Sequence, residues 1–439
     1  GCAKRGAGRA SSSMSTRRQW RWRQVARKLW VRAAVFSLLA AGMAILAIFV
    51  EPDIPKSVSR RIGAESVGDL LDVIAASMLS VSIFSMTTVV AALSLATSTA
   101  TPRSTRLLSE DPASQNALAT FIGSFIFSLV GIIALQTGLY DERGRITLYL
   151  VTVAVIVIIV VTLLRWMEHV FRLGMVGYIT EQIEMRTAHV LRAHHGRPFL
   201  GGTPWPSSRP VPAGAAALYA RQFGYVQHVD MHALHALLER TGGTLFIDAL
   251  PGAYADAARP LAWLAGAAMD EETRSGLRRA FTVAETRTFD QDPRFGIAVL
   301  AEIASRALSP AINDPGTGID VLGRAERLLF MWSEPEPPEA RRIDYPLVHV
   351  PPVELDDLFK DAFTPIARDG ARMVEIALRL QKTLHSLGML NPAYAEVARR
   401  HSALALERAE AALDFGPDRE RVREAAHALQ TLPSPDAAQ

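Results

Sequence analysis

Four long apolar runs dominate the first 170 residues of the chain. Residues 33–50, 73–99, 118–137 and 147–166 carry almost no charged side chains. An α-helix rises ~1.5 Å per residue, so that about 20 apolar residues cross the hydrocarbon core of a bilayer. These lengths predict four transmembrane helices within a membrane region at 33–172. The uncharged part of the second run extends to Pro102, which is longer than the core needs, so one end should project into water.

The basic residues before the first run predict its orientation. Seven Arg and Lys residues lie within 14–32, whereas the loop after the first run has three basic residues against five acidic ones. Basic residues concentrate on the cytoplasmic side of membrane proteins, which places the N-terminus there. An even number of spans then returns the chain to the cytoplasm. The composition fits a membrane protein, with 49% hydrophobic residues and a mean hydropathy of +0.15.

Residues 14–32 are expected to form a basic interfacial helix. Trp20, Trp22 and Trp30 alternate with arginines, a pattern typical of segments held by anionic headgroups. Nucleic-acid binding is the alternative, but the adjacent span favours the membrane, and no nucleic-acid partner is expected. Residues 1–13, which include the single cysteine Cys2, are set aside as a disordered tail or cloning remnant. The first apolar run continues into an acidic, proline-containing loop, which predicts a retained anchor instead of a cleaved signal.

The part after the fourth run predicts a cytoplasmic α+β region, and the helical pattern of the fourth run is expected to continue without a break into a stalk helix. The first expected segments are a stalk helix with a Pro/Gly-rich linker at 173–214 and a small α/β module at 215–266. A helical segment at 267–332, a Pro-rich connector at 333–352 and C-terminal helices at 353–439 follow. The pattern predicts strands at 224–229, 244–250 and 345–350, and a helix after Asp230. The fold class is therefore mainly α, with four transmembrane helices followed by this α+β domain.

One polar stretch of the helical segment is a candidate ligand or interface site. Asp292-Pro293 and Asp314-Pro315 have the pattern of helix starts, since Asp caps free amides and Pro fits the first turn. Further polar residues flank them and could converge, giving the candidate set Arg287, Asp290, Asp292, Arg294, Asn313 and Asp314. A ligand site at these helix N-termini and a polar contact between domains or subunits are both open. Asp111-Pro112, before the third apolar run, has the same pattern of a helix start. Between Pro293 and Asp314, apolar residues recur at helical spacing and predict one apolar helix face, namely Phe295, Val299, Leu300, Ile303, Ala307 and Leu308.

The sequence offers little support for catalysis or metal binding. His228, His232 and His235 are spaced like weak metal-ligand candidates, but a helix capped by Asp230 would put only the last two on one face. Solvated or half-buried histidines are the favoured interpretation. We find no phosphate-binding loop and no nucleophile elbow in the sequence. We therefore expect no enzyme, no bound metal and no cofactor.

The second run carries a stripe of hydroxyl and small side chains along one helical face. No titratable group lies within the apolar cores of the four runs, which argues against a proton-coupled transporter. Such a stripe is typical of close helix–helix contacts, and it could equally line a water-filled path that an aromatic ring constricts. The candidate pore-lining residues are Ser77, Ser80, Phe84, Thr87, Ser94, Ser98 and Thr101.

Three segments resemble the hallmark segments of a bacterial family of predicted membrane proteins, domain of unknown function 2254. They are FSMTTVVAALSLATSTATPR at 84–103, GYVQHVD at 224–230 and RTFDQDPRFGIAVLAEIASRALSPAINDPGTGID at 287–320. The resemblance covers nearly the whole chain after Met14. It implies a multi-pass protein of the bacterial inner membrane with a cytoplasmic C-terminal part. It implies no established activity and no catalytic residues.

Two functional classes follow from these patterns. The first is a homo-oligomeric, channel-like protein with a hydroxyl-lined second helix and a cytoplasmic regulatory domain. The second is a membrane-anchored scaffold or sensor that acts through its cytoplasmic domain and has no pore. The position of the hydroxyl stripe distinguishes them, because a channel needs this face to meet other copies of the chain.

Overall fold

The chain folds into two compact units that divide between Ile179 and Thr180. The computed structural model describes residues 29–49, 64–104, 111–140, 142–206, 208–335 and 342–431. The predicted tail at 1–13 and most of the interfacial segment at 14–32 lie outside these residues.

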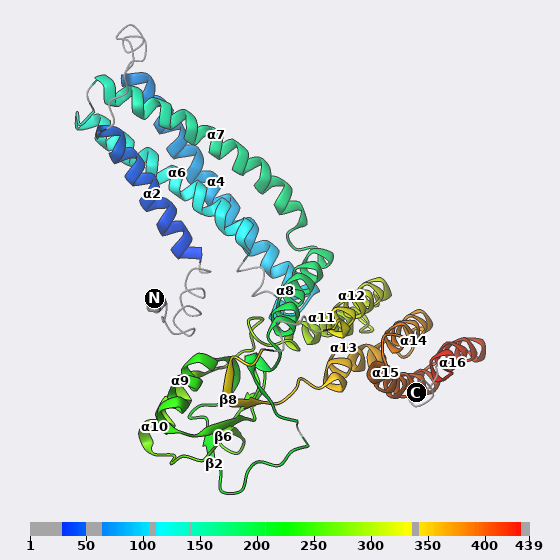
Figure 1. Cartoon of the computed structure of the whole chain (residues 1–439). Coiled ribbons are helices and arrows are strands. Elements are labelled where there is room, and N and C mark those ends of the chain that lie inside the picture. Colours follow the sequence, from blue (N-terminus) through cyan, green and yellow to red (C-terminus); the bar gives the residue numbers. More distant parts are fainter. Residues whose placement is uncertain are drawn as a thin grey trace, which may run out of the picture. The chain divides into compact units, whose positions relative to one another are not determined.

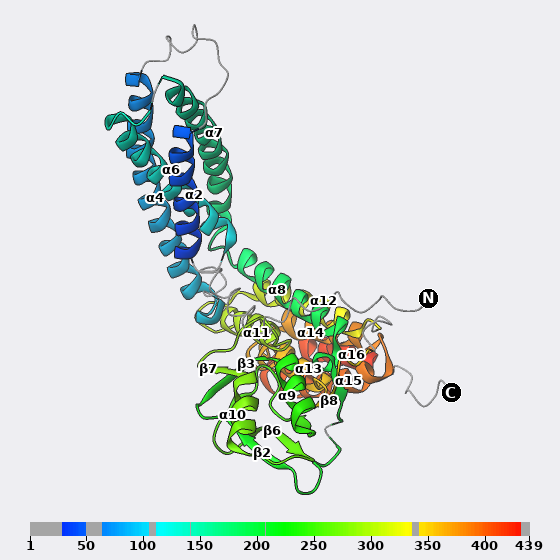
Figure 2. The same cartoon turned by 60° about the vertical axis from the view of Figure 1, so that its left-hand side comes forward.

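The N-terminal unit consists of long helices that lie side by side (Figures 1 and 2). They are α2 (Leu29–Phe49), α4 (Ala64–Thr99), α6 (Pro112–Gln136) and α7 (Glu142–Arg172), followed by the start of α8 (Val176–Gly196). Among the described residues, three helices are long and apolar enough to span a bilayer, over Ser66–Thr97, Pro112–Gln136 and Gly144–Arg172. The apolar part of α2, Trp30–Leu46, is shorter. Three of the four predicted spans are thus matched by helices of sufficient length and apolarity.

Side-chain contacts define the directions of these helices. Arg32 near the start of α2 donates to Asn116 near the start of α6 (2.9 Å), so α2 and α6 run in parallel. His169 near the end of α7 lies 3.4 Å from Ser114 of α6, which makes those two antiparallel. Leu95 near the end of α4 lies next to Gly174, directly after α7. The helices therefore alternate in direction along the chain.

Helix α6 is the most buried helix of this unit. Phe121 and Phe127 are almost completely buried and belong to one core with Leu71 of α4 and Leu148 of α7. A Cβ at Gly123 would lie 3.3 Å from the carbonyl oxygen of Phe36, so the glycine permits close approach of α2. Small residues at such contacts are typical of helix packing in lipid.

The connection from α7 to α8 differs from the predicted continuous stalk. Helix α7 ends at Arg172, and α8 begins only at Val176. Gly174 between them has φ +109°, a conformation that L side chains rarely adopt. This glycine therefore breaks the helix, although the apolar periodicity continues through it.

The described residues of the C-terminal unit form two β-sheets. The five-stranded sheet has the order β1-β8-β4-β6-β2 and the three-stranded sheet the order β5-β3-β7. The strands are β1 (Gly202–Pro204), β2 (Ala216–Tyr219), β3 (Gly224–Val229), β4 (Thr244–Ile247), β5 (Tyr254–Ala255), β6 (Pro260–Ala265), β7 (Phe281–Ala284) and β8 (Tyr345–Val350), with the short helix η1 (Pro198–Gly201) before β1. The predicted strands at 224–229 and 345–350 are confirmed.

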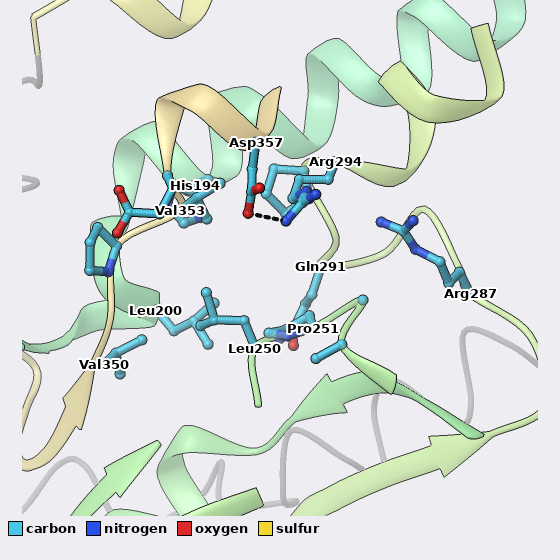
Figure 3. Close-up of a pocket in the computed structure, with 15 residues that line it drawn as sticks. His194, Leu200, Leu250, Pro251, Arg287, Gln291, Arg294, Val350, Val353 and Asp357 are labelled. Atoms are coloured by element: carbon cyan, nitrogen blue, oxygen red, sulfur yellow. Dashed lines mark hydrogen bonds and ion pairs between the residues drawn. The ribbon is translucent and has the colours of Figure 1, made fainter. Parts of the chain in front are cut away.

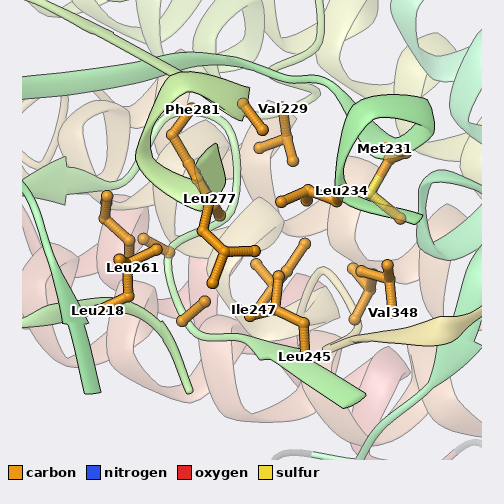
Figure 4. Close-up of a cluster of buried hydrophobic side chains, with 14 of the residues drawn as sticks. Leu218, Val229, Met231, Leu234, Leu245, Ile247, Leu261, Leu277, Phe281 and Val348 are labelled. Carbon is orange, nitrogen blue, oxygen red and sulfur yellow. The ribbon is translucent and has the colours of Figure 1, made fainter. Parts of the chain in front are cut away.

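The sheet region is assembled from more of the chain than the predicted module at 215–266. Strand β8 pairs in parallel with β1 and with β4, although about 140 and 100 residues separate it from them along the chain. Helices α9 (Met231–Thr241) and α10 (Glu271–Ala280) contribute to the same core. Figure 4 shows this core, in which Leu234, Leu245, Leu277 and Val348 are almost fully buried.

The rest of the C-terminal unit is helical, as predicted. Helix α11 packs against α12 and α13, and α14 packs against α12, α15 and α16. These helices are α11 (Phe295–Ala307), α12 (Pro315–Ser333), α13 (Leu355–Asp369), α14 (Val374–Gly388), α15 (Pro392–Ala412) and α16 (Gly416–Gln430). The apolar positions predicted for one face of α11, such as Val299, Leu300 and Ile303, are all buried.

Candidate functional site

The hydroxyl stripe of α4 lies on the exposed surface of the N-terminal unit. Phe84 at its centre is 71% exposed. Four other predicted members are also exposed, namely Ser77, Ser80, Thr87 and Ser94. Thr101 is buried, and the side chain of Ser98 lies outside the described residues. Most of the stripe is therefore free to face lipid or another chain.

The exposed half of α4 has two chemically different sides. Helical spacing places Ile83 and Met86 on a face next to the stripe, together with Leu79 and Val90. All four are large, apolar and at least 45% exposed. This apolar side suits lipid tails, whereas the stripe consists mainly of small polar residues.

Two of the stripe hydroxyls satisfy their own donors within α4. Ser80 donates to the carbonyl oxygen of Ala76 (3.1 Å) and Thr87 to that of Ile83 (3.0 Å). Such bonds to the preceding turn allow hydroxyls to reside in an apolar environment. The oxygen lone pairs remain on the surface as acceptors.

A second polar cluster lies at the start of α6. Asp111 caps this helix by accepting from the amide of Ser114 (2.8 Å), as the Asp-Pro pattern predicts. Its carboxylate also binds Nε2 of His169 (2.8 Å) and the hydroxyl of Tyr178 (3.3 Å). Ser, His and Asp are the residues of a nucleophilic triad, but here Ser114 and Asp111 contact the same ring nitrogen. In a catalytic triad, the Asp and the Ser contact opposite ring nitrogens of the histidine. This cluster therefore has a structural role and does not form a catalytic triad.

The charged stretch before α11 is built around a buried carboxylate. Asp292 is 3% exposed and accepts two bonds from Arg287, at 2.8 and 3.1 Å. It also accepts from the amides of Arg294 and Phe295, at 3.1 Å each. Burial raises the pKa of Asp292, and the bonds from Arg287 oppose this shift. Asp292 thus holds the first turn of α11, although the helix begins two residues later than the Asp-Pro pattern suggests.

Gly252 is required by the position of Asp292. A Cβ at Gly252 would lie 2.3 Å from Oδ2 of Asp292, and the backbone φ is +95°. Both facts exclude a larger side chain. The sequence prediction missed this residue, and the Pro251-Gly252 turn was the only local signal of it.

Arg294 connects the start of α11 to α13. Its guanidinium donates to both oxygens of Asp361, at 2.7 and 3.1 Å, and to Asp357. A bidentate pair of this kind fixes the orientation of both side chains. The two segments are about 65 residues apart, so no local sequence pattern predicts this pairing.

A pocket of about 220 Å³ adjoins these residues (Figure 3). Its lining residues come from the end of α8, from η1, from the turn after β4, from the stretch before α11, from the end of β8 with the residues that follow it, and from the start of α13. Its apolar lining includes Leu200, Leu250, Pro251, Val350 and Val353, and its polar lining includes His194, Arg287, Gln291, Arg294, Glu354 and Asp357.

The structure separates the predicted cytoplasmic candidates into two groups. Arg287 and Arg294 line the pocket, and Asp292 binds Arg287 without lining the pocket itself. Asp290 is half-buried nearby and does not line it. Asn313 and Asp314 lie at the other end of α11, where Asp314 caps α12 through the amide of Thr317 (3.1 Å). The expected convergence of all six residues is therefore incorrect, because a whole helix separates the two groups.

The three histidines do not share a face. His228 is buried in β3, His232 is exposed on α9, and His235 lies 3.5 Å from Glu239. Asp230 caps α9 as expected. Within the described ranges, no group of three or more His, Cys, Asp and Glu side chains is arranged to hold a metal ion.

Apolar helices of membrane-spanning length, joined to an α+β unit, define an integral membrane protein. The chain belongs to the family of predicted membrane proteins DUF2254, whose model matches residues 26–386. It is 26% identical over 249 residues to uncharacterized proteins of Mycobacterium bovis and Mycobacterium tuberculosis. The match covers 55% of this chain and 47% of each relative, so the chain spans about half the length of these curated relatives. No solved structure matches the chain.

Proposed function

We propose that this protein is a homo-oligomer in which α4 of several copies lines a channel-like path across the bacterial inner membrane. The observation that carries the proposal is the exposed stripe around Phe84. If the stripe served packing within one chain, the other helices of the unit would cover it. Its exposure instead leaves it available to a second copy.

The proposal includes α2 as a fourth span. Helix α2 has 21 residues, which corresponds to about 31 Å of helix. It runs parallel to α6, and Tyr140 after α6 donates to the carbonyl oxygen of Ala44 late in α2 (2.5 Å). Two helices that are in contact at both ends favour a common depth in the membrane. Four spans then place both termini in the cytoplasm, in agreement with the arginine excess before Ala33.

The chemistry of the stripe suits a water-filled path. The hydroxyls of Ser80 and Thr87 each offer an acceptor to water while their protons remain bound to the helix. Phe84 projects from the middle of the stripe, and a ring of such side chains closes a path by dewetting. The apolar side of α4 around Ile83 and Met86 would remain in contact with lipid.

A scaffold or sensor without a pore is the alternative function. The pocket of the C-terminal unit favours it, because a cavity lined by polar and apolar groups is typical of ligand binding. In that case the α4 stripe would serve only dimer packing or lipid contact. The two functions differ in whether the stripes of several copies meet around an axis.

Disulfide crosslinking in native membranes tests whether the α4 stripes of different copies face one another. In a Cys2→Ser background, Ser80→Cys and Phe84→Cys place thiols on the stripe, and Ile83→Cys and Met86→Cys serve as matched controls on the lipid side. A disulfide needs Cα atoms within about 4.4–6.8 Å, so only residues near a shared axis crosslink. We expect oxidised dimers for the first pair alone. Equal crosslinking at all four positions, or none on the stripe, would rule the arrangement out.

A further inference from the structure

His194 lies at the wall of the pocket and carries two polar ring nitrogens. Its side chain is partly buried, and one ring face packs on Trp332 with centroids 4.9 Å apart. Burial lowers the pKa of His194 to about 4, and the neighbouring His195 acts in the same direction. The imidazole is therefore neutral near pH 7, with one N–H donor and one acceptor. Among the described residues, neither nitrogen has a hydrogen-bond partner.

Two further side chains have unused donors at this pocket. Arg287 donates two of its five N–H groups to the carboxylate of Asp292. Gln291 accepts from the amide of Val229 (2.9 Å) through Oε1, which leaves its NH₂ group unassigned within the described part of the chain. Figure 3 shows His194 and Asp357 on one side of the pocket, and Gln291 and Arg287 toward the other. The pocket is thus polar at two separated edges.

The walls between these edges are apolar. Leu200 and Leu250 lie along one side of the pocket, with Val350 beside them (Figure 3). The volume of about 220 Å³ is below the ~300–1,000 Å³ typical of pockets for drug-sized ligands. A flat molecule of one or two rings fits this space better than a flexible chain.

The charges of the lining residues disfavour an anion. Asp292 neutralises Arg287 through a bidentate pair, and Asp357 and Asp361 both bind Arg294. The two guanidinium groups therefore form ion pairs with three carboxylates, which leaves no excess positive charge in this group of side chains. An added anion would meet these carboxylates in a partly buried site, where like charges repel strongly. The anion site that the helix N-termini suggested is therefore less favourable than a site for an uncharged ligand.

We propose that the pocket binds a small uncharged heterocycle of the nucleobase class. Its ring acceptors would bind the donors of Arg287 and Gln291, and its N–H groups would bind Asp357 and His194. Its flat faces would lie against Leu200 and Leu250. This site is independent of the α4 path, because it lies wholly within the C-terminal unit.

Isothermal titration of the purified full-length chain with adenine and with hypoxanthine tests this inference. We expect at least one of them to bind, with one site per chain. His194→Phe keeps the packing on Trp332 and removes both nitrogens, so it should weaken binding about five- to tenfold. Leu250→Trp should abolish binding by filling the pocket. His189→Phe, on the same helix but outside the pocket, is the matched control and should bind like the parent.

The outcomes separate the ligand classes. Sodium acetate and sodium phosphate are titrated in parallel as anionic probes. Binding of an anion but of neither base would overturn the proposal, as would the absence of heat with all four compounds. Unchanged affinity in His194→Phe would also overturn it. Melting temperatures of the three variants close to that of the parent establish that any loss of binding is not a loss of fold.

Discussion

At the scale of single residues, the turn at Gly252 determines whether the charged stretch before α11 can form. The glycine leaves just enough space for the Asp292 carboxylate, which in turn holds Arg287 and two backbone amides. A buried carboxylate that loses these partners has no access to water. The turn and the carboxylate therefore form one structural unit, although 40 residues separate them.

Gly252→Ala should destabilise the protein by more than ~2 kcal/mol, because it adds a steric clash to an unfavourable backbone angle. Gly266→Ala is the matched control, with φ +75° and no atom within 4 Å of the added Cβ. It should cost only ~1–2 kcal/mol from the backbone alone. Thermal unfolding of the purified variants measures both. Equal losses in the two variants would mean that the contact with Asp292 is unimportant.

Several residue roles could be predicted from the sequence because they are local. Asp111, Asp230 and Asp314 each cap the helix that follows them. The partners of Asp292 and Arg294 could be predicted only in part. Arg287 is near in sequence, whereas Gly252 and Asp361 are brought in by the fold. Local patterns carry no information on such distant contacts.

At the scale of elements, a carboxylate on α8 connects this helix to α12. Glu184 accepts from Arg327 at 2.7 and 3.0 Å and also from Arg324. Burial alone would raise the pKa of Glu184, but the two arginines lower it below the ordinary value of 4.5. The connection therefore depends on an ionised carboxylate.

This pKa shift predicts a pH dependence of stability. Because the folded pKa of Glu184 lies below its unfolded value, its contribution is complete above pH 4.5 and is lost as the pH falls through the folded pKa. Glu184→Gln should therefore show a shallower fall in melting temperature below pH 4.5 than the parent. Glu396→Gln, at an exposed position of α15, should behave like the parent. Identical acid profiles for all three proteins would refute the assignment.

The elements themselves were predictable to different degrees. Apolar periodicity located the buried face of α11 and the strands at 224–229 and 345–350. It missed the break at Gly174, because one glycine does not interrupt an apolar pattern. It also missed the five-stranded sheet as a unit, since the pairing of β8 with β1 and β4 joins distant segments.

At the scale of the whole molecule, the proposed topology requires opposite sides for two sites in the chain. Gly144 lies at the start of the last span and Gly214 lies beyond it. With four spans and a cytoplasmic N-terminus, Gly144 faces the periplasm and Gly214 the cytoplasm. Alkaline phosphatase fusions should be active only at Gly144, and green fluorescent protein fusions should fluoresce only at Gly214. The same side for both would refute the four-span topology.

The central claim is that α4 lines a path that Phe84 closes, and conduction through planar bilayers tests it most directly. Purified parent protein and Phe84→Ala are compared, with Ile83→Ala as the control on the lipid side of the same helix. Removing the ring should widen the constriction, so Phe84→Ala is predicted to conduct more than the parent, while Ile83→Ala matches it. If neither the parent nor Phe84→Ala conducts, or if Ile83→Ala raises conduction equally, the claim is contradicted.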